Sequence, residues 1–86
     1  MQTVLISVKE VSLLIKLNDI INDEPFNQLS IKMGPDRDYI IDVKSMLSMI
    51  SIFNHTMYMV IDGDKSIIND MIDRIESIEG MTIIDL

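Results

Sequence analysis

The sequence predicts one α+β domain, in which a mostly antiparallel four-stranded sheet carries helices on a single face in the order β-α-β-β-α-β-α. Apolar residues alternate with a period of two in some segments and recur at intervals of three and four in others. Residues 34–38, Gly-Pro-Asp-Arg-Asp, are typical of a hairpin turn. A length of 86 residues with 48% hydrophobic content builds one core and not two, so we expect residues 1–86 to form a single domain.

The first strand and the first helix follow from this periodicity. Residues 2–8 alternate and predict a strand. From Lys9 the period becomes that of an amphipathic helix, which we expect to end before Pro25 because the residue ahead of a proline is pushed out of the α region. The apolar face of this helix consists of Leu13, Leu14, Leu17, Ile20 and Ile21.

A hairpin and a short helix come next. Residues 26–33 and 39–43 have strand periodicity, and the turn at 34–38 joins them. Residues 42–53 predict the end of a strand that runs straight into a helix, with Ser45 at the N-cap position.

The second half contains the clearest helix. Residues 56–61 are β-branched and aromatic enough to predict a strand. After the turn Asp62-Gly63-Asp64 we expect a helix with Asp64 as its N-cap and Gly80 as its C′ residue. Residues 81–86 either add a short edge strand or pack as a tail. The apolar face of the helix consists of Ile68, Met71, Ile72, Ile75 and Ile78.

Composition argues against several classes of partner. Lys and Arg number 7 against 14 Asp and Glu, and the net charge of -7 argues against nucleic acid or an anionic membrane as a partner. The sequence has no cysteine, which excludes disulfides and thiolate metal sites. The first residues carry no basic segment and the apolar runs are far shorter than a membrane span, so we expect a cytoplasmic protein.

The acidic clusters do not form a catalytic or metal-binding motif. Asp62-Gly63-Asp64 lacks the spaced ligands and terminal glutamate of a calcium loop, so we interpret it as a turn with a helix cap. Asp36-Arg37-Asp38 is interpreted as a solvated hairpin tip. No Ser-His-Asp or phosphate-loop pattern is present in the sequence. We therefore predict no enzyme activity, no metal and no cofactor.

The segment 44–52, Lys-Ser-Met-Leu-Ser-Met-Ile-Ser-Ile, carries a family resemblance. It resembles the Lys-Ser-Ile-Met-Gly-Val-Met-Ser-Leu run of HPr, the histidine-containing phosphocarrier family of the bacterial phosphoenolpyruvate-dependent sugar phosphotransferase system. The order and spacing of the predicted elements agree with that family over almost the whole chain. The resemblance implies an HPr-like open-faced sandwich.

The phosphoryl-carrying loop of that family is missing. HPr carries its phosphoryl group on the histidine of a Gly-(Ile/Leu)-His-(Ala/Thr)-Arg-Pro-Ala loop, where this chain has Ser-Val-Lys-Glu-Val-Ser-Leu-Leu at residues 7–14. Histidine, arginine, proline and glycine are all absent there, and Glu10 would repel a phosphate. The only histidine, His55, follows the central helix, and we interpret it as a solvated loop residue. We therefore expect a divergent member without histidine phosphotransfer.

The resemblance also implies a site on the central helix. Ser45 matches a serine that a dedicated kinase phosphorylates in Gram-positive relatives, and a phosphate is favoured at a helix N-terminus. Met46, Leu47 and Ile50 correspond to an outward patch that docks partner proteins, whereas Met49 and Ile52 turn into the core. Alternatively, Ser45 is only an N-cap, and the apolar helix is buried or pairs with another copy in a homodimer.

These features predict an HPr-like regulatory or protein-binding module. Its partner would be a kinase, another phosphotransferase-system component or a regulator. One alternative is a phosphocarrier with a relocated phosphoacceptor, which would be His55. Another is a ferredoxin-like small-ligand regulator of the ACT type, because its β-α-β-β-α-β order overlaps with the predicted one and residues 81–86 would then matter as a strand.

Overall fold

The computed structural model describes the backbone of residues 1–86 and every side chain except that of Met46. The chain has the predicted α+β class, with helices and strands distributed along its whole length. The elements are β1 (Gln2–Val8), α1 (Leu13–Ile21), the 3₁₀ turn η1 (Glu24–Phe26), β2 (Ser30–Asp36), β3 (Tyr39–Asp42), α2 (Met46–Ser51), β4 (Thr56–Asp62), α3 (Lys65–Glu76) and β5 (Met81–Asp85).

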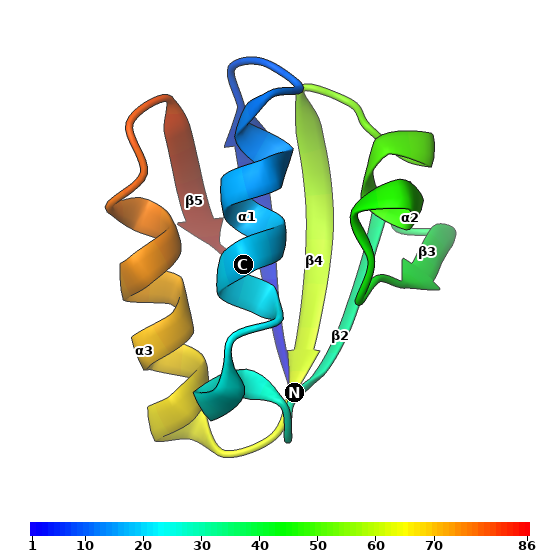
Figure 1. The fold of residues 1–86 in the computed structure, drawn as a ribbon. Coiled ribbons are helices and arrows are strands. Elements are labelled where there is room, and N and C mark those ends of the chain that lie inside the picture. The colour runs from blue at the N-terminus through cyan, green and yellow to red at the C-terminus, as the bar shows by residue number, and fades with distance from the viewer.

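The sheet has five strands in the order β3-β2-β4-β1-β5, and every neighbouring pair is antiparallel (Figure 1). The prediction of four strands is therefore wrong, because the sheet has one strand more. The additional strand is β5, which pairs with β1 so that Leu5 lies opposite Ile84. Of the two alternatives for residues 81–86, the edge strand is correct, because the alternating side chains of Met81 and Ile83 pack on the core while Ile84 is exposed.

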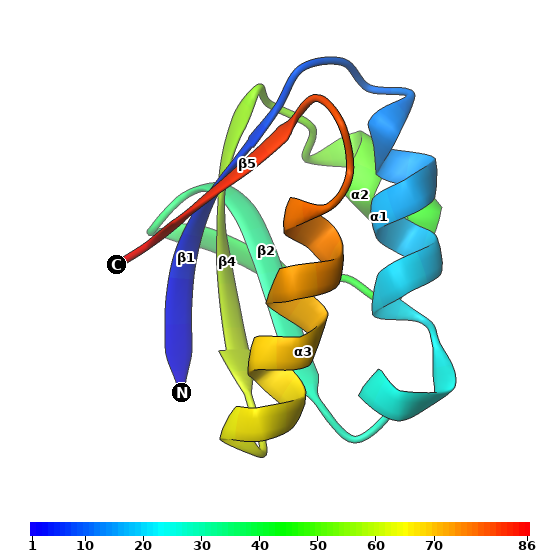
Figure 2. The same cartoon turned by 90° about the vertical axis from the view of Figure 1, so that its left-hand side faces the viewer.

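The helices lie on one face of the sheet, as predicted, and the other face is open (Figure 2). The alternation of β1 sets this arrangement, since Val4, Ile6 and Val8 are buried under the helices while Leu5 and Ser7 face the open side. Five further strand residues that are fully buried complete the sheet side of the core, namely Ile31, Met33, Met57, Met59 and Ile61. The helices contribute mainly Leu14, Leu17, Ile21, Met49, Met71 and Ile75.

Four of the strands form two interlocked split β-α-β units. The helix α1 joins β1 to β2, which lie on either side of β4, and α3 joins β4 to β5, which lie on either side of β1. The strand β3 and the helix α2 are inserted between β2 and β4. The helix α2 therefore sits at the β3 side of the molecule, where it contacts α1 (Figure 1).

Long-range contacts move two predicted boundaries in the first half. The helix α1 begins at Leu13 rather than Lys9, because the N–H of Lys9 donates to the carbonyl of Gly80 at 3.0 Å and continues the ladder between β1 and β5. The strand β2 begins at Ser30 rather than at residue 26, because η1 occupies that segment and buries Phe26 completely.

The hairpin turn is tighter than predicted. The strand β2 continues through Asp36, whose carboxylate accepts the N–H groups of Asp38 at 2.8 Å and Tyr39 at 2.9 Å. A glycine is required at position 34, because a Cβ atom there would overlap the carbonyl oxygen of Tyr39. The close approach of β3 to β2 thus depends on Gly34.

The helix α3 has the predicted N-cap and a different end. The carboxylate of Asp64 accepts the N–H groups of Ser66 at 2.9 Å and Ile67 at 3.4 Å. The helix ends with Ser77 as its C-cap, so the prediction of Gly80 as the C′ residue is wrong. Gly80 instead lies in the turn before β5 with φ +92. Among the described helices, none is both long and apolar enough to cross a membrane.

Candidate functional site

Ser45 is the N-cap of α2, as predicted. Its backbone is extended, with φ -137 and ψ 147, and its exposed hydroxyl oxygen accepts the N–H of Ser48 at 3.3 Å. The same hydroxyl donates to the hydroxyl of Ser48 at 3.0 Å, and the hydroxyl of Ser51 donates to the carbonyl of Ser48 at 2.7 Å. The three serines therefore form a polar stripe along α2 that the sequence indicates through its spacing of three.

The apolar residues of α2 divide into an outer and an inner set. Leu47 is 78% exposed and Ile50 is 47% exposed, and their spacing of three places them on the same side of the helix. Met49 and Ile52 are buried in the core. The division agrees with the one that the resemblance implies, except that the predicted outward position of Met46 falls on a side chain outside the described ones.

Lys44 fixes the junction between β3 and α2. Its ammonium group donates to the carbonyl of Phe26 at 3.2 Å, so the junction is tied to η1. Burial lowers the pKa of Lys44, and the nearby charge of Asp42 partly opposes this effect. The hydrogen bond from Lys44 to Phe26 and the complete burial of Val43 hold the start of α2 in place.

His55 lies beside the end of β1, although the two are 47 residues apart in the sequence. Its carbonyl accepts the N–H of Val8 at 2.7 Å, and its Nδ1 lies 3.2 Å from the carbonyl oxygen of Val8. Because a carbonyl only accepts, this contact is a hydrogen bond when Nδ1 carries a proton. His55 and Lys9 line the same shallow depression. His55 follows the C-terminal end of α2, so it does not join Ser45 in one site.

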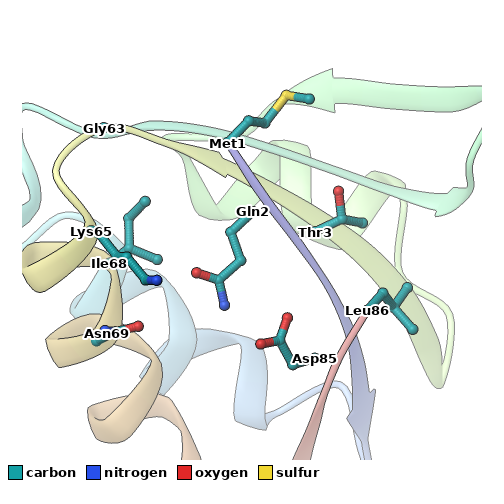
Figure 3. Close-up of a pocket in the computed structure, with 9 residues that line it drawn as sticks. All are labelled: Met1, Gln2, Thr3, Gly63, Lys65, Ile68, Asn69, Asp85 and Leu86. Atoms are coloured by element: carbon teal, nitrogen blue, oxygen red, sulfur yellow. The ribbon is translucent and has the colours of Figure 1, made fainter.

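A polar cleft lies between the start of β1, the end of β5 and the first turns of α3. Figure 3 shows the side chains of Gln2, Lys65, Asn69 and Asp85 converging on it. These side chains supply an ammonium group, a carboxylate and two amides around a volume of about 520 Å³. Sequence analysis missed this cleft because it exists only when β5 lies against β1. The other lining residues are Met1, Thr3, Gly63, Ile68 and Leu86.

The described side chains include no group of three histidine or acidic residues that could hold a metal ion. The α2 region presents the exposed hydroxyl of Ser45 together with two exposed aliphatic side chains, Leu47 and Ile50. His55 presents an exposed imidazole, and the cleft offers mixed charges and amides. In comparisons with known proteins, no family model, no curated protein and no solved structure matches this chain.

Proposed function

We propose that this chain is an HPr-like domain that lacks histidine phosphotransfer and acts as a regulatory, protein-binding module. Its contact area is the α2 surface, defined as Ser45, Met46, Leu47 and Ile50. The observation that carries the proposal is the pair of exposed aliphatic side chains, Leu47 and Ile50, beside the exposed hydroxyl of Ser45. The order of elements from β1 to α3 is the one that the resemblance implies, and α2 occupies the corresponding place.

The start of α1 supports the loss of phosphotransfer. In a phosphate site at a helix N-terminus, the first N–H groups must be available to the anion. Here Leu13 donates to the carbonyl of Glu10 at 3.1 Å, and Leu14 donates to the carbonyl of Val11 at 3.0 Å. These N–H groups are occupied, and the carboxylate of Glu10 adds a repelling charge in the same turn.

A protein partner accounts for the exposed aliphatic side chains of α2. Burying an aliphatic side chain contributes about 1.5–3 kcal/mol, so covering the exposed parts of Leu47 and Ile50 would favour association by about 1–2 kcal/mol each. Methionine at position 46 suits an adaptable contact of the same kind.

Ser45 provides a switch for this contact. A kinase would transfer the γ-phosphoryl group of ATP to Oγ of Ser45, with loss of the hydroxyl proton and release of ADP. The dianion would end the donation to the hydroxyl of Ser48 and place two negative charges beside Leu47. Binding to the α2 surface would therefore depend on phosphorylation.

The test is affinity capture of partners from bacterial cytoplasm, with the wild type compared with Leu47→Glu and Ile50→Glu. Val11→Glu is the matched control, because Val11 is 48% exposed and lies outside α2. We expect the wild type and the control to retain one phosphotransferase-system component or kinase that both α2 variants lose. Equal capture by all four proteins would contradict the proposal.

A second candidate function is a ferredoxin-like regulator that binds a small metabolite. The specific observation is β5, which completes the two split β-α-β units and forms one side of the polar cleft. Lys65 and Asp85 could bind the carboxylate and the ammonium group of an α-amino acid, while the amides of Gln2 and Asn69 orient it. A thermal-shift screen of amino acids would show stabilisation that Lys65→Met abolishes, and a flat screen would exclude this candidate.

A further inference from the structure

The outer side of β5 is an unpaired sheet edge. β5 is the last strand in the sheet order, and Figure 2 shows no helix or strand lying outside it. From this edge we propose that two copies of the chain pair antiparallel through β5 and join their sheets into one continuous sheet. The proposal does not depend on the function assigned to the α2 surface.

The ladder between β1 and β5 shows which backbone groups face outward. Lys9 donates to the carbonyl of Gly80 at 3.0 Å, and Leu86 donates to the carbonyl of Thr3 at 3.1 Å. In an antiparallel ladder the residues that bond to one neighbour alternate, so residues 80, 82, 84 and 86 bond to β1. The N–H and C=O groups of residues 83 and 85 and the carbonyl of residue 81 point away from β1.

The two edges of the sheet differ in their protection. The strand β3 at the opposite edge has four residues, and its register with β2 shifts between Met33 and Asp36. Short edge strands and irregular register both discourage pairing with another chain. The strand β5 has five residues in unbroken register with β1 and contains neither proline nor lysine. The one charged residue of β5 is Asp85 at its end, so the β5 edge is less protected than the β3 edge.

A second copy fits this edge because the pairing is self-complementary. A two-fold axis at Ile83 places each Ile83 opposite the same residue of the second copy, and Met81 opposite Asp85 of the second copy. The outward N–H groups of Ile83 and Asp85 then meet outward carbonyls of Ile83 and Met81, which gives four hydrogen bonds. No two carboxylates face each other in this register.

The side chains of β5 also suit this pairing. Ile83, which packs partly against the core, would contact its own copy on the helix side of the sheet. Ile84 is exposed on the open side, where it would lie beside Thr82 of the second copy. The carboxylate of Asp85 is turned into the polar cleft with Gln2 and Lys65 (Figure 3), so it does not obstruct the edge.

We expect the association to be weak and to strengthen with salt. One strand pair buries less than the ~1,000 Å² of a stable interface, so a dissociation constant of about 10⁻⁴ M is expected. Each copy carries a net charge of -7, and salt screens the resulting repulsion.

Analytical ultracentrifugation over a concentration series tests the proposal, with Ile84→Lys as the disrupting variant. Tyr39→Lys is the matched control, because Tyr39 is similarly exposed on the opposite edge strand. We expect the wild type and the control to dimerise with equal constants and Ile84→Lys to bind at least tenfold more weakly. Concentration-dependent amide shifts should appear at residues 83 and 85.

Three results would overturn the proposal. The first is a wild-type protein that stays monomeric, at both low and high salt, up to a protein concentration about tenfold above the expected dissociation constant of ~10⁻⁴ M. This result overturns the proposal even if an unrelated extended peptide binds β5. The second is a dimer that Ile84→Lys leaves unchanged. The third is a dimer that Tyr39→Lys weakens as much as Ile84→Lys does. A circular dichroism spectrum of each variant verifies that it is folded.

Discussion

The hydroxyl of Ser45 lies 3.3 Å from the amide nitrogen of Ser48 and 3.0 Å from its hydroxyl, so one side chain both starts α2 and presents a group to solvent. A helix of six residues depends strongly on its cap, because most of its N–H groups have no partner within the helix. Any change at Ser45 therefore acts on the stability of α2 as well as on the α2 surface.

Removing the cap should destabilise the fold. Ser45→Ala is expected to lower the free energy of unfolding by about 0.5–2 kcal/mol, whereas Ser45→Asp keeps a good N-cap and should cost less than about 0.5 kcal/mol. Urea denaturation of both variants measures the difference, with Ser51→Ala as the control at the end of the serine stripe. If Ser45→Ala is as stable as the wild type, the cap does not support α2.

The inner and outer apolar residues of α2 should respond differently to truncation. Met49→Ala leaves a cavity in the core and should cost about 2–5 kcal/mol. Leu47→Ala removes an exposed side chain and should change stability by less than about 0.5 kcal/mol. Thermal and urea unfolding of this matched pair distinguish a docking helix from a buried one, because a buried α2 would make both changes costly.

Gly34→Ala should disrupt the hairpin. The added methyl group would overlap the carbonyl oxygen of Tyr39, so β3 must move away from β2. We expect a loss of about 3 kcal/mol or more, together with faster amide exchange in β3. Ser30→Ala at the exposed start of β2 is the control. Unchanged protection of β3 in Gly34→Ala would show that the two strands are not held at this close approach.

Acid should weaken the contact between η1 and α3. The hydrogen bond from Arg74 at 2.6 Å, aided by the N–H of Glu24, lowers the pKa of Asp23 from 3.8. The stabilisation is fully present above the unfolded pKa of 3.8 and is lost as the pH falls through the lower folded pKa. Asp23→Asn should therefore be less stable than the wild type at neutral pH and lose less stability on acidification.

Unfolding free energies between neutral and strongly acidic pH test this contact, and Asp19→Asn, an exposed change in α1, is the control. Parallel pH profiles for the wild type and Asp23→Asn would contradict the role of Asp23.

The chain should not accept a phosphoryl group on histidine. Incubation with phosphoenolpyruvate and enzyme I is expected to give no acid-labile phosphohistidine, because the N–H groups at the start of α1 are occupied. His55→Gln identifies any residual signal, since His55 is the only histidine in the sequence. Labelling of the wild type that His55→Gln abolishes would favour the phosphocarrier alternative instead.

Local sequence patterns predicted the elements that are set by local chemistry. The alternation of β1, the β-branched and aromatic composition of β4 and the cap at Asp64 are local, and the sequence predicted all three correctly. The start of α1 and the strand β5 depend on contact between the two ends of the chain, such as the bond from Lys9 to Gly80. No periodicity within either segment could reveal that contact.

The candidate sites follow the same division. The outward position of Leu47 and the inward position of Met49 are those that the family resemblance implies, whereas the period of α2 alone left a buried helix open as the alternative. The place of His55 beside Val8 was not predictable, because it results from the pairing of β1 with β4. The polar cleft at Asp85 was missed for a similar reason, since it needs β5 beside β1.

Phosphorylation by the serine kinase that acts on HPr is the most direct measurement of the proposed function. The wild type, Ser45→Ala, Leu47→Glu and Val11→Glu would be incubated with the kinase and ATP, and the modified residue would be mapped by mass spectrometry. We predict phosphate on Ser45 in the wild type and Val11→Glu, none in Ser45→Ala, and at least tenfold slower modification of Leu47→Glu. Absence of phosphate from Ser45, or equal rates for Leu47→Glu and the wild type, would contradict a regulatory role for the α2 surface.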